Sequence, residues 1–375
     1  MSVNQADKKT GGLAGVIAGQ SAICTCGIGN GLNYYGYSIE DLAHHAEFEE
    51  VAYLLQFGEL PQKNELIQFK NKIIANRALS ENLKTILRTI PKNIHPMNLM
   101  QTAVAALGTL EEEREDFKDQ DEKIIRLLGI LPSILCYHHH YVNFGKEIDF
   151  ISDQTSIAGY FLEKLKLQTP QEDFIKAMQC SLILYAEHEF NASTFTARIC
   201  ASTKSDIFSA VAAAIGALRG PLHGGANEAA MYLIESFKSI DDAIKGVNQK
   251  LENKELLMGF GHRIYGLNGD PRSTLIKAWA KHLGGDTLLF KIGEAIETLM
   301  KEKRPTLPPN ADFYSALTYH FMGIPTAYFT PIFIMSRVSG WCAHIKEQRA
   351  NNKLIRPSSE YIGVKPRKFL KIQDR

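Results

Sequence analysis

Apolar residues recur at helical spacing along most of the chain. In segment 48–58 they share one face of a helix, which Gly58 and then Pro61 would end. The apolar positions are Phe48, Val51, Ala52, Leu54 and Leu55. Segment 64–74 shows a second such face, and Asn64 is the expected N-terminal cap. Since alternating strand patterns are few and short, the pattern predicts an all-α fold.

Two further segments depart from this amphipathic pattern. Segment 206–220 begins with Asp206, ends with Gly220 and contains six small residues that would let another helix approach closely. We therefore expect a helix that is buried or lies between subunits. Segment 111–123 carries eight acidic and three basic side chains, which is typical of a solvated loop or helix face.

Length and charge narrow the class of protein. The 375 residues correspond to about two domains. A formal charge of +1 disfavours broad electrostatic binding to nucleic acid or to an anionic membrane. No apolar run approaches the ~18 residues of a membrane helix, and residues 1–12 lack an apolar signal segment. Six dispersed cysteines without a CxxC pair fit reduced thiols, so we expect a cytoplasmic protein.

Three histidines lie beside glycines or other turn-forming residues. They are His188 in YAEHEFNAST, His223 in GPLHGGANEAAM and His262 in LMGFGHRIYGLNGDPRS. His223 precedes an expected helix that includes residues 230–237, and a helix N-terminus lowers the pKa of a histidine. A neutral imidazole at that place can donate a hydrogen bond to a developing enolate oxygen. Each histidine taken alone fits a structural role better than a catalytic one.

One carboxylate and three arginines complete the candidate chemistry. Asp312 stands in PPNADFYSALTYHFMGIP at the start of a helical run, where it would be either a helix cap or a general base with a pKa raised by desolvation. Arg272, Arg337 and Arg356 occur in GDPRS, MSRVSGW and KLIRPSS. Singly they would form surface ion pairs, whereas together they indicate a small dianionic substrate.

Several common motifs are missing or unsuitable. Gly27, Gly29 and Gly31 in CGIGNG do not match GxGxxG, and the chain contains neither GxxxxGK[ST] nor GxSxG. The histidines at 138–140 are consecutive, and adjacent residues of a helix point in different directions. We therefore expect no metal site there or at the histidine pair 44–45.

Taken together and in order, five motifs resemble the citrate synthase family. They are PLHGGAN, GFGHRIY, GDPR, NADFYSA and IRPS, and the resemblance extends from about Gly12 to Gly363. Longer stretches are most similar to the 2-methylcitrate synthase branch of that family. These are GLAGVIAGQSAICT, FEEVAYLLQFGELP, LYAEHEFNASTFTAR and HIKEQRANNKLIRPSSEYIG.

The resemblance implies a role for each motif residue. Asp312 would remove a proton from the carbon α to a thioester, and His223 would stabilise the resulting enol or enolate oxygen. His262 would polarise the carbonyl of oxaloacetate. The expected oxaloacetate ligands are His188, Arg272, Arg337 and, from the partner subunit, Arg356. The backbone expected to receive the CoA adenine is that of Leu257, Met258, Gly259, Phe260 and Gly261.

The resemblance also implies an architecture and a reaction. Each subunit of a homodimer would have a large helical domain, residues 1–223 and 319–375, and a small helical domain, residues 224–318. The substrates would be propanoyl-CoA and oxaloacetate, with 2-methylcitrate and CoA as products and without a metal or redox cofactor. A long N-terminal extension, as in NADH-regulated hexameric citrate synthases, is not seen, which favours a plain dimer.

The choice of thioester stays open at this point. One methylene in an apolar pocket is worth only ~1–3 kcal/mol, so citrate synthesis from acetyl-CoA or the use of both thioesters is an alternative. Tyr185 and Phe313, which neighbour site positions, are expected to shape the acyl pocket. A non-catalytic homologue that binds CoA or a dicarboxylate is the alternative from another class.

Two places depart from the family pattern. Tyr35 stands where the family usually has an arginine. The step from His262 to Arg272 is ten residues where the family usually has nine, and Gly266 replaces a frequent lysine. We expect the extra residue to bulge the loop at Gly266 and Gly269, which would alter the local contacts to the CoA phosphates.

Overall fold

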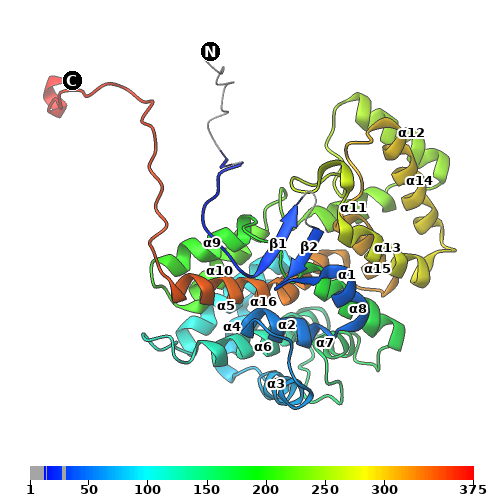
Figure 1. Cartoon of the computed structure of the whole chain (residues 1–375), viewed down its shortest axis with the longest axis horizontal. Coiled ribbons are helices and arrows are strands. Elements are labelled where there is room, and N and C mark those ends of the chain that lie inside the picture. Colours follow the sequence, from blue (N-terminus) through cyan, green and yellow to red (C-terminus); the bar gives the residue numbers. More distant parts are fainter. Residues whose placement is uncertain (1–11, 14, 28–30) are drawn as a thin grey trace.

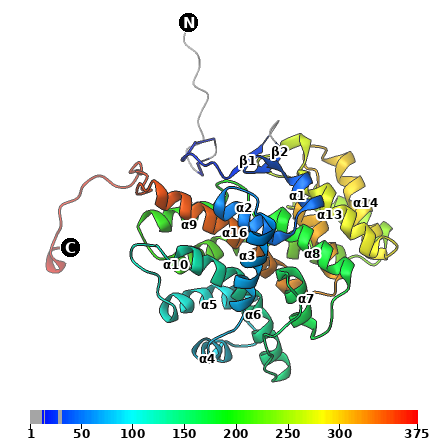
Figure 2. The same cartoon turned by 60° about the horizontal axis from the view of Figure 1, so that its bottom comes forward.

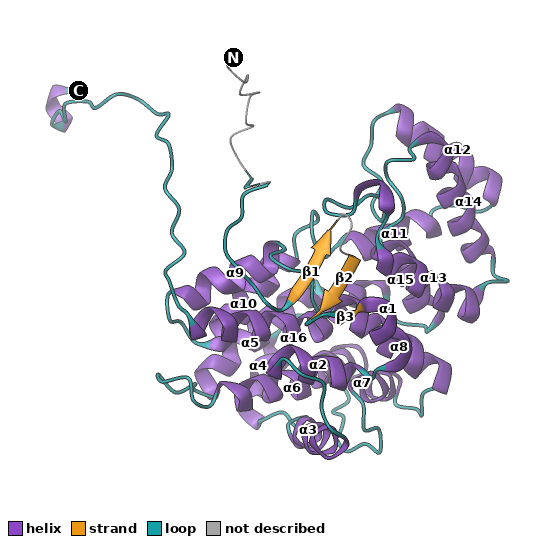
Figure 3. Ribbon diagram, viewed as in Figure 1, coloured by secondary structure: helices purple, strands orange, loops and turns teal. Residues whose placement is uncertain are grey.

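The computed structural model describes residues 12–13, 15–27 and 31–375. In these ranges the chain forms sixteen α-helices and one small antiparallel sheet (Figure 1, Figure 3). The helical fold class is confirmed, with the short sheet as an addition. Gly29 of CGIGNG and residues 1–11 of the segment considered for a signal lie outside the described residues.

The helices follow one another with short connections. The first eight are α1 (Ile39–His45), α2 (Phe48–Phe57), α3 (Lys63–Ala75), α4 (Glu81–Thr89), α5 (Pro96–Leu110), α6 (Gln120–Phe144), α7 (Ile157–Lys166) and α8 (Glu172–Tyr185). The others are α9 (Ala192–Ser202), α10 (Ile207–Leu218), α11 (Ala226–Glu235), α12 (Ile240–Glu252), α13 (Pro271–Gly284), α14 (Leu288–Lys303), α15 (Ala311–Phe321) and α16 (Phe329–Ala350). Short 3₁₀ turns are η1 (Gly266–Asn268), η2 (Thr326–Tyr328) and η3 (Ile372–Asp374).

The ends of the first two predicted helices show which local signals set the helix boundaries. Helix α2 ends as expected, because Gly58 adopts a left-handed φ of 83° and its N–H bonds to the carbonyl of Leu54. Helix α3 begins one residue before Asn64, so the expected cap was wrong. The cap is Gln62, whose N–H donates to the Glu65 carboxylate at 2.7 Å within a capping box. This reciprocal pair satisfies two otherwise free donors.

The small-residue helix and the acidic run meet in the structure. Helix α10 begins as predicted, with the Asp206 carboxylate accepting the N–H of Ser209 at 2.8 Å, and it packs against α5, α9 and α16. The acidic run is solvated only in part, since Glu113 is buried. Its carboxylate accepts two hydrogen bonds from Arg349, at 2.8 and 2.9 Å, and one from the N–H of Ile207 at 2.7 Å. Ion pairing thus overrides the solvation expected for this side chain.

Helix α16 forms the centre of the core. It is buried on almost all sides and packs against α2, α6, α8, α9 and α10. A helix that is enclosed on every side lacks an amphipathic stripe, which is the general behaviour of central helices. Polar residues on α16, including Arg337 and His344, are therefore fixed inside the protein.

The sheet anchors the N-terminal segment on this core. Strands β1 (Cys24–Gly27), β2 (Gly31–Tyr34) and β3 (Tyr37–Ser38) pair antiparallel in that order, with Cys24 opposite Tyr34. The buried Tyr34 hydroxyl donates to the carbonyl of Ile183 at 3.1 Å, near the C-terminus of α8. The sheet is thereby tied to the turn that follows α8.

The molecule has a larger helical part and a smaller group at one end. Helices α11–α15 gather together in Figure 1, and α13 and α14 lie on the same side in the turned view of Figure 2. The proposed boundaries of a small domain at 224–318 stay a prediction. In both views the C-terminal segment after α16 leaves the body of the molecule. Across the described ranges, none of the helices combines the length and apolarity needed to cross a bilayer.

Candidate functional site

Most of the predicted site residues lie at turns and helix ends that face one another. They come from the turn after α8 (His188), the turn before α11 (His223), the loop between α12 and α13 (His262), the first turns of α13 (Arg272) and α15 (Asp312), and the middle of α16 (Arg337). Ring contacts, hydrogen bonds and mutual effects on pKa connect them, as described below.

Asp312 is buried at the start of α15 but is not its helix cap. The N-cap of α15 is Asn310, whose side chain accepts the N–H of Asp312 at 3.0 Å. The Asp312 carboxylate receives a hydrogen bond from the Tyr185 hydroxyl at 2.7 Å. Burial raises the pKa of Asp312 to about 6, against the opposing effects of the Tyr185 hydrogen bond and of Arg272. A carboxyl group tuned in this way can accept a proton near neutral pH.

Arg337 lies close enough to Asp312 to lower its pKa, and part of the Arg337 guanidinium is without a hydrogen-bond partner among the described residues. It is 1% exposed, and its Nε donates to the main-chain carbonyl of Tyr185 at 2.7 Å. The guanidinium carbon lies 4.8 Å from the ring centre of Phe333, which also contacts the Tyr185 ring. Nη1 of Arg337 is buried without a hydrogen-bond partner in the described part of the chain. Such a donor suits the carboxylate of a bound ligand.

His223 is held as a neutral ring with a defined tautomer. Its Nε2 accepts the main-chain N–H of Ser193 at 3.4 Å and lies 2.8 Å from the Ser193 hydroxyl, which Trp341 contacts at 3.1 Å. Because Nε2 is an acceptor, the proton of the neutral ring is on Nδ1. The pKa is lowered to about 3, first by burial and then by Arg337, so the helix N-terminus considered from the sequence is not the main cause.

His262 and His188 form a second pair of rings, 5.0 Å apart between centres. Nδ1 of His262 accepts the N–H of Ile264 at 3.2 Å, which leaves Nε2–H as its donor. Nε2 of His188 lies 2.8 Å from the hydroxyl of Tyr265. Burial and the charge of Arg272 lower the pKa of His262 to about 4 and that of His188 well below its usual value. Both rings are therefore neutral near pH 7.

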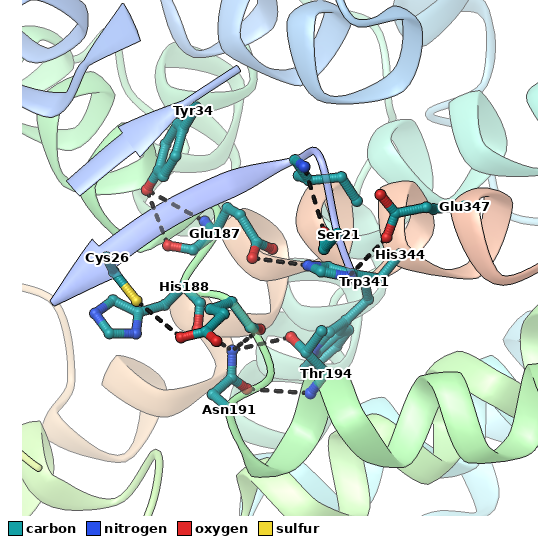
Figure 4. Close-up of polar contacts among 12 residues, drawn as sticks. Ser21, Cys26, Tyr34, Glu187, His188, Asn191, Thr194, Trp341, His344 and Glu347 are labelled. Carbon is teal, nitrogen blue, oxygen red and sulfur yellow. Dashed lines mark hydrogen bonds and ion pairs between the residues drawn. The ribbon is translucent and has the colours of Figure 1, made fainter. Parts of the chain in front are cut away.

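The turn that carries His188 is fixed from three sides (Figure 4). The Tyr34 hydroxyl of β2 accepts the N–H of Glu187 at 3.2 Å. The buried Glu187 carboxylate contacts Nε2 of His344, on α16, at 2.8 Å. Asn191 caps α9 immediately after the turn. The strand, α9 and α16 together set the position of His188.

Arg272 is buried and already paired. Asp270 caps α13 and accepts two hydrogen bonds from the Arg272 side chain, at 2.9 and 2.8 Å. Its second oxygen also accepts the N–H of Ala311 at 3.1 Å, which ties α13 to the start of α15. Although burial opposes it, Arg272 keeps the pKa of Asp270 below its ordinary value. Arg272 is thereby held at the site beside the segment that carries Asp312.

The segment predicted to receive CoA is joined to the same place. Gly261 N–H donates to the Pro308 carbonyl at 2.7 Å, and Asn310 N–H donates to the Gly259 carbonyl at 3.0 Å. Gly259 and Gly261 have φ values of 88° and 78°, a conformation that favours glycine. In addition, the rings of Phe260 and Phe313 lie 4.6 Å apart between centres. Leu257 is buried and Met258 is half-buried in this segment.

The loop after His262 contains a tight turn between two glycines. Residues 266–268 make the 3₁₀ turn η1, and Gly266 and Gly269 have φ values of 54° and 74°. These two glycines therefore allow the loop to turn, and the proposal that they accommodate a residue additional to the family pattern stays a prediction. Tyr35 also has a positive φ, 47°, and its ring lies beside Gly58.

Two groups of predicted residues are not part of this arrangement. Arg356 is exposed on the C-terminal segment beyond α16, so the chain does not bring it to its own site. On α6, the histidines at 138–140 contact the Ile90 carbonyl, the Tyr328 hydroxyl and the Lys164 carbonyl respectively. Their side chains diverge, as expected for consecutive helical positions. The described ranges contain no group of three or more His, Cys, Asp or Glu residues able to hold a metal.

Sequence reasoning missed the side chains that hold the site together. Ser193 fixes His223, Tyr265 contacts His188, and Asp270 pairs with Arg272. The signal for Asp270 was present, because an aspartate before a proline at a helix start is a typical cap. Ser193 carries no such signal, since its partner is 30 residues away in the chain.

Comparisons with known proteins agree over nearly the whole chain. The family model described as citrate synthase, C-terminal domain, matches residues 12–358. A 2-methylcitrate synthase of Shewanella oneidensis is 51% identical over 100% of both chains, and citrate synthase 2 of Bacillus subtilis is 41% identical over 98% of this chain and 99% of the relative. The solved ternary complex of carboxymethyl coenzyme A and oxaloacetate with citrate synthase from Thermoplasma acidophilum has a TM-score of 0.91 at 30% identity, covering 96% of this chain and 98% of that chain.

Proposed function

Because the chain belongs to the citrate synthase family, whose members are condensing acyltransferases that use CoA thioesters, we propose that it is a 2-methylcitrate synthase. It would condense propanoyl-CoA with oxaloacetate and water to give 2-methylcitrate and CoA. The observation that carries the proposal is the buried Asp312 carboxyl group, with a pKa of about 6. Arg337 and Arg272, which lower that pKa, also lower those of His223 and His262, two neutral histidines that each retain one N–H donor.

The first step is removal of the α-proton of the thioester. That proton is weakly acidic, so a base and an oxyanion donor must act together. Asp312 accepts the proton, and Nδ1–H of His223 donates to the thioester oxygen as it gains negative charge. A neutral imidazole keeps this donor throughout the step, because the pKa of His223 lies near 3.

The second step forms the new carbon–carbon bond. The enolate carbon attacks the ketone carbon of oxaloacetate, and the carbon–oxygen π bond opens. The resulting alkoxide is stabilised by a hydrogen bond from Nε2–H of His262 and takes up one proton, which balances the proton that Asp312 removed. Arg272 and Arg337 bind the substrate carboxylates, for which the unsatisfied Nη1 of Arg337 is suited. Water then attacks the thioester carbonyl of the adduct, the carbon–sulfur bond breaks, and CoA leaves as the thiol.

The experiment that tests catalysis is the substitution Asp312→Asn. It should abolish CoA release from propanoyl-CoA and oxaloacetate while the helical circular dichroism spectrum stays unchanged. Asp286→Asn is the matched control, because that side chain is exposed on the loop before α14. Equal CoA release by the wild-type protein and Asp312→Asn would favour the non-catalytic, ligand-binding homologue instead.

The preference for propanoyl-CoA rests on the 51% identical relative, and citrate synthesis is the second candidate because of the 41% identical one. Phe313 and Tyr185 are fully buried near the base and would line the acyl pocket. The decisive measurement is kcat/KM for propanoyl-CoA and acetyl-CoA at saturating oxaloacetate. We expect the higher value for propanoyl-CoA, and a higher value for acetyl-CoA would overturn this part of the proposal.

We further propose that the site is completed in a homodimer by Arg356 of the second subunit. The support is its exposed position on a segment that leaves the body of its own chain (Figure 1). Mixing refolded Arg356→Ala and Asp312→Asn proteins should restore activity, since one site of each mixed dimer would hold both wild-type residues. Random mixing makes half of the dimers mixed, so about a quarter of wild-type activity is expected. No recovery from confirmed mixed dimers would contradict the exchange.

A further inference from the structure

Tyr185 bonds to the base and to an arginine of the site through different atoms. Its hydroxyl donates to Oδ1 of Asp312 at 2.7 Å, and its main-chain carbonyl accepts from Nε of Arg337 at 2.7 Å. We propose that Tyr185 is a positioning residue that sets the orientation and basicity of Asp312 relative to the dicarboxylate held by Arg337. This inference rests on the proposed function and adds a residue to its machinery.

The direction of the hydrogen bond follows from the chemistry of the two groups. An ionised carboxylate can only accept, so the phenol must donate. Burial and the neighbouring Asp312 raise the pKa of Tyr185 well above its ordinary value, which keeps the phenol protonated. In the described chain no other side-chain donor bonds the Asp312 carboxylate. The bond therefore occupies Oδ1 and leaves Oδ2 to meet the substrate proton.

The hydroxyl does more than fill space. The Tyr185 ring is packed by Phe333, with 4.4 Å between ring centres, and phenylalanine would fill the same volume. The hydroxyl alone reaches Asp312, and the Ser315 hydroxyl lies 2.8 Å from it. Both partners sit in the first two turns of α15, whereas Tyr185 ends α8. The contact thus fixes the base of one element against the helix that also orients Arg337.

The other charged groups near Asp312 act in known directions. Arg272 and Arg337 lower its pKa and Asp270 raises it, but burial is the largest effect and the Tyr185 hydrogen bond is the largest one opposing it. Removing the hydroxyl alone should therefore move the pKa of Asp312 upward from about 6. The main-chain link to Arg337 would remain.

The test is Tyr185→Phe, measured as kcat and KM across pH with propanoyl-CoA and oxaloacetate. We expect kcat to fall about tenfold or more, as for loss of a hydrogen bond to a charged group. The acid limb of the pH profile of kcat, which is the fall in rate at low pH, should move to higher pH by a measurable fraction of a pH unit or more. The KM for oxaloacetate should change less than twofold. An unmoved acid limb, or a rise in KM alone, would overturn the inference.

Two matched variants separate positioning from packing. Ser315→Ala removes the neighbour of the tyrosine hydroxyl but keeps the bond to Asp312, so its acid limb should stay near that of the wild type. Replacing Tyr185 by a fluorinated tyrosine gives a more acidic phenol and a stronger donor, which should move the acid limb downward. A shift in Ser315→Ala as large as that in Tyr185→Phe would favour a packing effect and overturn the proposal.

A measurement without turnover separates this inference from the proposed function. Carbon-13 NMR of carboxyl-labelled aspartate, assigned by the signal lost in Asp312→Asn, reports the pKa of the base directly. If the wild type released no CoA from either thioester, the proposed function would fail. The inference about Tyr185 fails instead when the Asp312 signal titrates identically in wild type and Tyr185→Phe.

Discussion

Gly340 lies where the central helix α16 packs directly against the turn that carries His188. A Cβ at this position would be 2.3 Å from the Ala186 carbonyl oxygen and 2.3 Å from Oε2 of Glu187. Ordinary van der Waals contact begins at 3.4 Å, so the methyl group would be 1.1 Å too close to both atoms. One of them is main chain and the other belongs to a buried carboxylate, so neither can turn aside.

The magnitude for Gly340→Ala follows from two opposing effects. Alanine in a helix interior is favoured over glycine by about 0.8–1 kcal/mol. Overpacking in a close-packed core costs about 1–3 kcal/mol and more where the backbone must move. The second effect should dominate, with a net loss of about 1–2 kcal/mol in the free energy of unfolding. Since Arg337 is one helical turn away, separating α16 from the turn should also raise the KM for oxaloacetate.

The assay is urea unfolding followed by circular dichroism, together with KM for oxaloacetate. Gly246→Ala is the matched control, because it is also an interior helix glycine whose added Cβ would meet the ring of half-buried Phe237 at 2.4 Å. That ring is a side chain and can rotate, so the control should lose less stability and keep its KM. If Gly340→Ala were as stable as the control and bound oxaloacetate normally, the close approach would not be what positions His188.

Three other outcomes are expected. In the wild-type protein kcat/KM for propanoyl-CoA should fall about tenfold per pH unit below about pH 6, because the Asp312 base acts when it is ionised. An aspartate with the ordinary pKa of ~3.9 would instead leave the rate flat down to about pH 5. Asp270→Asn should lower the free energy of unfolding by about 3–5 kcal/mol, because it leaves the buried Arg272 charge uncompensated. An unchanged midpoint of the urea unfolding curve would contradict this. Ser193→Ala should reduce kcat about tenfold with little change in the KM for oxaloacetate, because it removes the hydroxyl contact to His223; an unaltered kcat would show that the main-chain contact suffices.

Helices were predictable from sequence where the signal is local. The left-handed Gly58 after α2 and the Asp206 cap of α10 follow from residues within one turn. The start of α3 was misplaced because a capping box of glutamine and glutamate competed with an asparagine cap two residues on. The burial of Glu113 could not be predicted from its acidic segment, because its partner Arg349 is 236 positions away.

The chemistry of the site was predictable as a set of residues but not as an arrangement. Asp312, His223 and His262 stand in recognisable motifs, whereas their protonation states depend on burial and on arginines from other elements. The sequence suggested a helix N-terminus as the cause of the low pKa of His223, and burial proved to be the larger effect. Tyr185 was expected beside the acyl group, and its bond to the base became visible only with α8 and α15 in place.

The arginines of the site have a second effect on its histidines. Arg272 lowers the pKa of His262 and of His188, and Arg337 lowers that of His223. A dianionic substrate that pairs with both guanidiniums offsets part of this effect and raises the histidine pKa values toward their usual range. In the proposed reaction, the N–H donor of His262 would then face the ketone of oxaloacetate with less positive charge around it. In the proposed reaction, the charges that would bind the dicarboxylate thus add to burial in keeping the imidazoles neutral. That is the protonation state in which His223 and His262 would serve as hydrogen-bond donors.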